Sequence, residues 1–167
     1  MAWIRETIKI RKGYNKEQRE VIAQEIIDFI VERTESGFDK RNEPFPSYSE
    51  SYKNSKKFRI GGKSAGRVNL TLSSEMLNSL KVLRHSNGEV IVGFDRTDNR
   101  NNDVAEGNIK GSYGKKIGDP DKARDFLGIK SSDKASIQDK YPLRNKKKLS
   151  DALKNFFLAK TGAEDTI

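Results

Sequence analysis

Residues 70–80 read Leu-Thr-Leu-Ser-Ser-Glu-Met-Leu-Asn-Ser-Leu. Ser73 is placed to cap a short helix from Ser74 to about Leu80, because a serine hydroxyl can accept a hydrogen bond from a free amide of the first turn. The chain then changes from helical to alternating spacing, which is typical of strands. Asn87-Gly88 favours a two-residue hairpin turn. This stretch therefore predicts a helix followed by a β-hairpin.

The predicted turn also sets the register of the hairpin. Both faces then carry apolar groups: Leu83 opposite Val92, His85 opposite Val90 and Phe94 on one face, and Val82 and Ile91 on the other. Met76, Leu77 and Leu80 form the buried side of the preceding helix. We expect one face of the hairpin to pack on a long helix and the other to be covered by a later part of the chain.

The segment after the hairpin is expected to be mostly loop. Residues 95–103 are polar, Val104 to Ile109 favour one helical turn, and glycines at 107, 111, 114 and 118 indicate an extended or adaptable loop. The sequence Ala-Arg-Asp-Phe-Leu-Gly-Ile at 123–129 then brings Phe126, Leu127 and Ile129 back to the core as a strand or turn.

The N-terminal part predicts a strand and a long helix. Residues 3–11 alternate between apolar and polar side chains, and a strand there needs a distant strand or another subunit as its partner. A helix from about Lys16 to Glu35 follows, with a capping box formed by Asn15 and Gln18. Gly37 stands where a glycine ends a helix.

Residues 38–69 are expected to be irregular, because two prolines interrupt them. Four aromatic side chains are spaced through this segment: Phe45, Tyr48, Tyr52 and Phe58. Tyr48 and Tyr52 would lie one turn apart on a short helix. The aromatic residues either fasten a long loop to the core or, with the neighbouring lysines, form a surface on which bases stack.

The predicted fold class is α+β, with a long N-terminal helix on a small antiparallel sheet that contains the central hairpin, and a short C-terminal helix. The expected parts are an arm at 1–14, a domain at 15–130 and a polar segment at 131–167. An amphipathic helix from about Ser150 to Lys160 is expected in the last part, because Leu149, Leu153, Phe156 and Phe157 recur at helical spacing.

Composition restricts the class of protein. The chain has 167 residues, 34% of them hydrophobic, below the roughly 45–50% of an average globular chain. We therefore expect a modest core. It has no cysteine, which excludes disulfides and fits a reducing compartment or a virion. No apolar run approaches the roughly 20 residues of a membrane span, so we expect a soluble protein without a membrane partner.

No constellation of residues predicts catalysis, a cofactor or a metal. His85 is the one histidine and is expected to be a partly exposed strand residue. The spacing of Asp95, Asp98 and Asp103 does not match a calcium loop. Residues 61–64, Gly-Gly-Lys-Ser, lack the first glycine of a phosphate-binding loop. We expect a protein that is not an enzyme.

The order of these elements resembles the neck, tail-completion and virion-morphogenesis proteins of tailed bacteriophages. Those proteins carry a Leu-Thr-Gly-x-Leu-x-x-Ser helix start before a hairpin and close with Arg-Pro-Phe-Leu. The matching positions here are Leu72-Ser73-Ser74 with Leu77 and Ser79, and Arg124-Asp125-Phe126-Leu127. Ser74 stands where glycine is common, and Asp125 where proline is common. The resemblance covers residues 15–130.

The resemblance implies a structural ring, often sixfold, at the head–tail neck of a virion assembled in the host cytoplasm. Its partners would be other copies of the chain, portal or adaptor proteins and tail proteins, with transient DNA contact in the lumen. We expect strand 3–11, segment 38–69 and loop 107–118 to contact neighbouring subunits. The candidate interface residues are Trp3, Ile8, Ile10, Phe45, Tyr48, Tyr52, Tyr113, Arg124 and Phe126.

An alternative function is sequence-independent binding of nucleic acid. The formal net charge is +9, which favours contact with phosphates. The densest basic run is 144–148, and Lys146, Lys147 and Lys148 are its candidate DNA-facing residues. The aromatic and basic residues from Tyr52 to Arg59 also support this alternative. The 24 acidic residues are interleaved with the basic ones, which weakens it.

Overall fold

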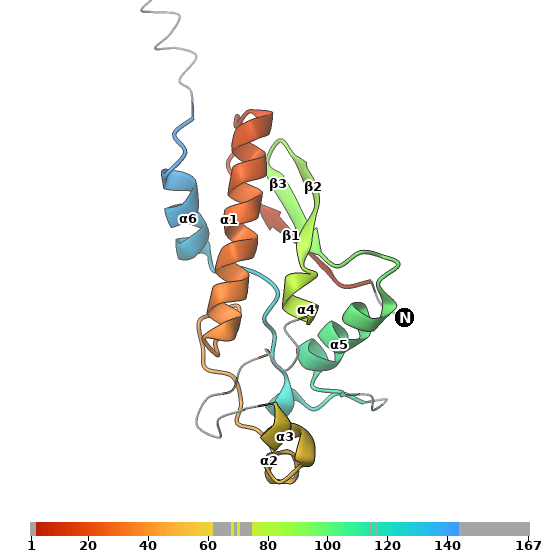
Figure 1. Ribbon diagram of the computed structural model, residues 1–167. Helices are drawn as coiled ribbons and strands as arrows, with labels where there is room; N and C mark the ends of the chain where they lie inside the picture. The colour runs from red at the N-terminus through yellow and green to blue at the C-terminus, as the bar shows by residue number, and fades with distance from the viewer. Residues whose placement is uncertain are drawn as a thin grey trace, which may run out of the picture.

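The fold is α+β, as predicted: a long helix lies against a small antiparallel sheet, and shorter helices surround this pair (Figure 1). A computed structural model describes residues 3–61, 68, 70, 75–113, 115 and 117–143. The predicted helix at 150–160 and the cap at Ser73 lie outside these residues. Among the described residues, no helix is both long enough and apolar enough to cross a bilayer.

The sheet has three strands in the order β1-β3-β2, all antiparallel. Strand β1 spans Arg5–Lys9, β2 spans Lys81–Ser86 and β3 spans Glu89–Gly93. The N-terminal strand thus finds its partner inside the chain, because β1 pairs with β3 over its full length. The hairpin strand β3 therefore becomes the centre of the sheet.

The predicted register of the hairpin is half right. His85 lies opposite Val90 as expected, but Val82, and not Leu83, lies opposite Val92. The pairing shifts between Val82 and Arg84, so Leu83 is an extra residue of the kind that forms a β-bulge. The predicted faces change accordingly, and Val82 joins Val92 on the side of the long helix.

The long helix α1 spans Lys16–Glu35 and has the predicted ends. Asn15 and Gln18 form the reciprocal capping box. Gly37 adopts a φ of 92° and lets Phe38 donate to the carbonyl of Arg33, which closes the C-terminal end. The helix buries an apolar stripe against the sheet: Ile22, Ala23, Ile26, Ile27 and Ile30. The sheet contributes Ile8, Val90 and Val92 to the same core.

A short helix precedes the hairpin, and a longer one follows it. Helix α4 spans Glu75–Asn78 and buries Met76 and Leu77, as expected. Helix α5 spans Asn99–Lys110 and is capped by Asp98. The prediction of a polar loop to residue 103 was therefore wrong in its second half. The local propensity of this asparagine-rich stretch is low, and its anchor is the long-range contact of Asn102.

Asn102 connects the start of α5 to the N-terminal strand. Its side chain is almost fully buried. The amide oxygen accepts a hydrogen bond from the backbone N–H of Ile4 at 2.7 Å. The amide nitrogen donates to the carbonyls of Asp95 and Asp98 at 2.7 and 2.8 Å. One side chain thus forms hydrogen bonds with three backbone groups. The carbonyls of Asp95 and Asp98 each accept a backbone N–H as well, so the Ile4 N–H is the group that depends on Asn102 among the described residues.

The expected glycine-rich loop is more compact than predicted. Gly107 lies within α5, and Gly111 ends this helix with a φ of 65°. A Cβ at Gly111 would lie 2.1 Å from the carbonyl oxygen of Asp119, and one at Gly118 would lie 2.2 Å from that of Lys110. These glycines permit close backbone packing where the prediction placed an extended loop.

The remaining helices are short. Helix α2 spans Glu50–Lys53, α3 spans Lys56–Ile60 and the 3-10 turn η1 spans Pro120–Lys122. Helix α6 spans Ser131–Asp139, where only a polar segment was expected. It packs on α1 through Ile137, and two contacts to Glu25 hold the residues after it. Lys140 pairs with Glu25 at 2.7 Å, and the Tyr141 hydroxyl donates to the same carboxylate.

Replacing Asn102 with alanine removes three hydrogen bonds and leaves the Ile4 N–H without an acceptor, so we expect Asn102→Ala to lower the free energy of unfolding by about 1–3 kcal/mol. Urea denaturation measures this loss. Asn99→Ala is the matched control, because Asn99 is exposed on the same helix and should change stability by less than about 0.5 kcal/mol. Equal losses in the two variants would contradict the role of Asn102.

The contact between α6 and α1 should depend on pH. The hydrogen bonds from Lys140 and then Tyr141 lower the pKa of Glu25. A carboxyl with a lowered folded-state pKa stabilises the fold above its unfolded-state pKa and loses this effect as pH falls through the folded-state value. We expect wild type to be more stable than Glu25→Gln at neutral pH, and the difference to vanish in acid. Urea titrations at both pH values measure it, with Glu32→Gln as the control.

Candidate subunit interface

Three aromatic side chains from the predicted irregular segment form one cluster. The ring centroids of Tyr48 and Tyr52 are 5.2 Å apart, and Phe58 lies 5.5 Å from each of them in an edge-on arrangement. Ser49 caps helix α2 and so places Tyr52 one turn after Tyr48. Tyr48 and Phe58 are buried. The aromatic residues therefore fasten the segment to the core, which was one of the two predicted roles.

Arg124 joins this cluster to the loop after α5. Its guanidinium carbon lies 5.1 Å from the ring centroid of Tyr48 and 5.4 Å from that of Tyr113. It also donates a hydrogen bond to the hydroxyl of Tyr113, and that hydroxyl donates to the carbonyl of Lys122 at 3.0 Å. Tyr113 takes a left-handed φ of 43°, and these contacts hold its ring in place.

The cluster places the positive charge of Arg124 beside the aromatic rings of Tyr48 and Tyr113. Arg124 is 7% exposed and has no ion pair with any residue that the structure describes. Burial raises the pKa of Tyr113, and the charge of Arg124 opposes this shift. Burial also raises the pKa of Tyr52, with a further contribution from Tyr48. Both tyrosines thus stay neutral, and Tyr113 presents its ring and its hydroxyl to the guanidinium.

The residues that follow Arg124 attach the same segment to α1. Phe126 is fully buried, and its carbonyl accepts a hydrogen bond from Arg33 at 2.5 Å. Asp125 pairs with Lys40 at 2.7 Å, and its carbonyl accepts from the Lys40 backbone. Arg124, Asp125 and Phe126 thus connect the aromatic cluster, the loop after α1 and the core. This segment is irregular, although a strand or turn was expected.

The candidate interface residues fall into two groups. Four of them come together in the cluster: Tyr48, Tyr52, Tyr113 and Arg124. Trp3 lies apart from the cluster, two residues before β1. The side chains buried inside the chain itself are Ile8, Ile10, Phe45, Tyr48, Arg124 and Phe126. Their apolar or stacked contacts are already made within one subunit, so these side chains build the scaffold, and their contact with a neighbouring subunit stays a prediction. Lys146, Lys147 and Lys148 lie outside the described residues.

Exposure leaves Trp3 and Tyr113 as the candidates with free surface. The indole of Trp3 donates to the carbonyl of Phe94 at 2.8 Å, and Arg5 stacks on its ring at 4.2 Å. Both tryptophan and tyrosine are enriched at protein interfaces because they combine apolar area with a polar tip. Tyr52 is partly buried.

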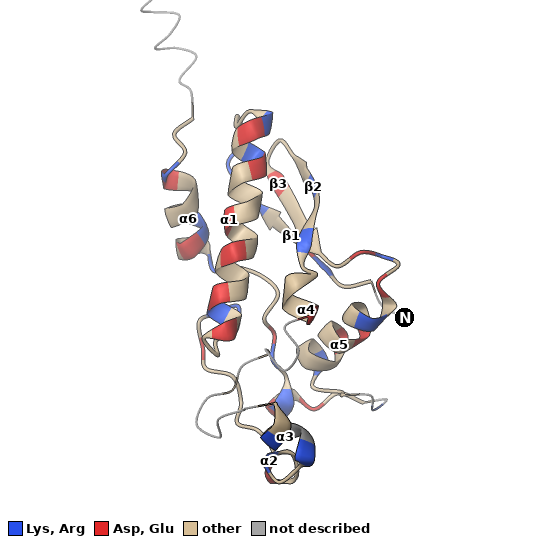
Figure 2. Ribbon diagram, viewed as in Figure 1, with Lys and Arg blue, Asp and Glu red and all other residues tan. Residues whose placement is uncertain are grey.

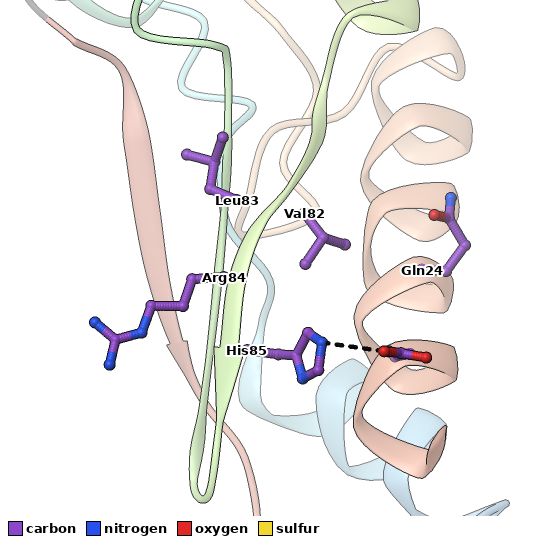
Figure 3. A pocket seen from close by; sticks show the side chains of 6 residues that line it. Gln24, Val82, Leu83, Arg84 and His85 are labelled. Atoms are coloured by element: carbon purple, nitrogen blue, oxygen red, sulfur yellow. Dashed lines mark ion pairs between the residues drawn. The ribbon is translucent and has the colours of Figure 1, made fainter. Parts of the chain in front are cut away.

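A shallow groove of about 470 Å³ lies between α1 and β2 (Figure 3). Val82 and His85 point from β2 toward α1, whereas Leu83 and Arg84 point away from it. His85 Nε2 lies 3.5 Å from Glu20 Oε1, and its side chain is 21% exposed. His85 is thus a partly exposed strand residue, as predicted. Its one described ionic neighbour is a carboxylate on the outer side of α1.

The acidic residues after the hairpin have structural partners. Asp95 pairs with Lys81 and accepts hydrogen bonds from Thr97, which lowers its pKa. Asp98 caps α5. Within the described part of the chain, no three histidine or acidic side chains converge in a way that would hold a metal ion.

Comparisons with protein-family models, with curated proteins and with solved structures find no match for this chain.

Removing the guanidinium from the aromatic cluster should loosen two loops at once. Arg124→Ala deletes both ring contacts and the hydrogen bond to Tyr113, so we expect a loss of about 2 kcal/mol in the free energy of unfolding. Limited proteolysis should then cut near Tyr113 faster. Arg41→Ala is the control, because the Arg41 side chain is 70% exposed in its ion pairs. A cut rate like that of wild type would refute the clamp.

Proposed function

We propose that this chain is a structural subunit of a ring at the head–tail junction of a tailed bacteriophage. The observation that supports this most is the role of the Ala123–Ile129 segment, which carries the resemblance to neck and tail-completion proteins. Its side chains hold the aromatic cluster, the loop after α1 and the core together. A resemblance in residues that hold parts of the fold together supports the proposal more strongly than a resemblance in scattered surface residues.

The fold of one chain is compatible with a subunit of a larger assembly. The core is closed within one subunit, because β1 pairs with β3 and α1 covers the inner face of the sheet. Two of the surfaces that stay exposed in the described part of the chain are the outer side of α1 and the outer face of the sheet. A subunit with two unlike free surfaces can join copies head to tail, and such contacts close into a ring when the rotation between copies permits.

The proposed location is the neck of the virion, with assembly in the host cytoplasm. The partners would be further copies of the chain, a portal or adaptor protein on the head side and a tail protein on the other side. DNA passes through the lumen of such a ring. The net charge of +9 is compatible with transient contact between the lumen and phosphates.

The alternative, binding of nucleic acid as the primary function, loses part of its support. The rings of Tyr52 and Phe58 pack on each other and on Tyr48, so they do not offer free faces for stacked bases. What remains is the net charge and the run at 144–148. A salt titration separates the two functions, because a phosphate-dominated binder loses affinity steeply as salt rises.

A nonsense mutation in the gene that encodes this chain tests the proposal directly. We expect lysates to contain DNA-filled heads and separate tails, because the particle lacks the ring that joins them. Electron microscopy of the particles is the measurement, and expression of the chain from a plasmid is the control that should restore joined particles. Normal virions, or the absence of filled heads, would contradict a joining role.

A further inference from the structure

We infer that copies of this chain bind each other head to tail, with the outer face of the sheet in one copy docking on the acidic outer side of α1 in the next. This inference rests on the proposed ring and specifies which two surfaces form its contact. It depends on the charges, the burial and the relative position of the two surfaces.

The first surface is the open sheet face, which consists of Arg5, Thr7, Lys9, Leu83, Arg84 and Ile91. Side chains alternate between the two faces along β1, so Arg5, Thr7 and Lys9 lie on the other face of the sheet from the buried Ile8. Thr7 and Arg84 are the pairing partners of Ile91 on its two sides. Leu83 and Arg84 point away from α1 (Figure 3). This face therefore has a partly apolar centre.

The charge of the open sheet face is positive. Lys9 is paired with Glu89 at 2.7 Å. Glu89 lies on this face too, and Arg84 also attracts its carboxylate. Arg5 and Arg84 form no close ion pair with any residue in the described ranges, and both are exposed. Arg5 instead stacks on Trp3, which extends the face at its edge. Two guanidinium groups thus border the partly buried Leu83 and Ile91.

The second surface is the α1 acidic face, which consists of Glu17, Glu20, Val21, Gln24, Asp28, Val31, Glu32 and Glu35. These positions recur every three or four residues and so share one side of the helix. At 1.5 Å per residue, the face is about 27 Å long. Figure 2 shows acidic residues along α1. Val21 is 45% exposed and Val31 is partly buried, so this side of the helix also carries apolar side chains.

The carboxylates of the α1 acidic face are largely unneutralised. Four of them make no ion pair with a residue that the structure describes: Glu17, Asp28, Glu32 and Glu35. The two arginines of the same helix do not balance them. Arg33 is buried and donates to the carbonyl of Phe126, and Arg19 donates to the carbonyl of Tyr14.

The two surfaces face opposite ways. Helix α1 covers the inner face of the sheet with its buried stripe, so the centre of its acidic side points away from the sheet. One edge of this side borders other elements, because Glu20 lies beside β2, and Asp28 and Glu32 lie beside α4. The open sheet face points outward from the other. Complementary charges on opposite sides of one subunit specify a heterologous contact, in which every copy uses both surfaces. Like charges on identical surfaces disfavour a two-fold dimer through either one.

Charge reversal on each surface, alone and together, tests this contact. The sheet variant is Arg5→Glu with Arg84→Glu, and the helix variant is Asp28→Lys with Glu32→Lys. We expect each variant alone to self-associate at least about tenfold more weakly than wild type, because its two surfaces then carry the same sign. An equimolar mixture of the two variants should associate again, since each surface meets an opposite one.

Sedimentation velocity is the measurement. Wild-type association should be strong in about 0.01 M salt, where the Debye length is about 30 Å, and weak in about 1 M salt, where it is about 3 Å. Lys56→Glu with Arg59→Glu is the matched control, because it changes the net charge as the sheet variant does but lies on α3. It should associate like wild type. Circular dichroism and urea denaturation check that each variant folds.

Several outcomes overturn the inference. Wild type that remains monomeric in low salt, variants that associate like wild type, or a mixture that fails to associate would each do so. A sheet variant that keeps self-association but loses affinity for a single-stranded oligonucleotide would assign the open sheet face to nucleic acid. These results are distinct from the particle phenotype, since a nonsense mutant that yields heads and separate tails would still support a neck ring built on other contacts.

Discussion

The structure depends on the packing of one apolar helix stripe against one face of a three-stranded sheet. Ile22, Ile26 and Ile30 of α1 are fully buried, and so are Val90 and Val92 of β3. A two-stranded hairpin alone would be only marginally stable. Pairing of β1 with β3 completes the sheet and places Ile8 beside the same helix. Every other element is attached to this two-layer unit.

The attachments are buried polar side chains, each of which makes specific contacts through part of its polar atoms. Asn102 connects the backbone just before β1 to α5. Arg33 connects α1 to the backbone at Phe126. Arg124 lies between the rings of Tyr48 and Tyr113. Each contact spans a long distance in sequence. A small core is thereby supplemented by specific contacts that hold the loops in one arrangement. Because an unpaired buried donor or acceptor is costly, these contacts also favour a single arrangement over alternatives.

The use of these side chains within one subunit affects how copies of the chain could assemble. Most of the apolar residues expected to meet neighbours are buried inside the subunit, and the outer sides of α1 and of the sheet carry many charged side chains. An interface built from such surfaces would be more polar than a core and would respond to salt. That property suits subunits that are made separately and join at a fixed stage, since charged surfaces keep free copies from aggregating.

Local patterns predicted several elements well. The capping box at Asn15 and Gln18, the glycine at 37 and the turn at Asn87-Gly88 are confirmed, because their signals depend on a few neighbouring residues. The α+β class followed from the change of period after Leu80. The fastening role of Tyr48 and Phe58 was one of two predicted alternatives, and their burial decides it.

What the amino-acid sequence determined by itself was the identity and order of the main elements, since hydrophobic period, caps and turn residues act over a few positions. Tertiary structure alone decided the partner of β1, the bulge at Leu83, the first half of α5, helix α6 and the burial of Arg124. Each of these depends on contacts between residues far apart in the chain. An arginine or an asparagine reads as a surface residue in sequence, and only the fold supplies the rings or carbonyls that allow it to be buried.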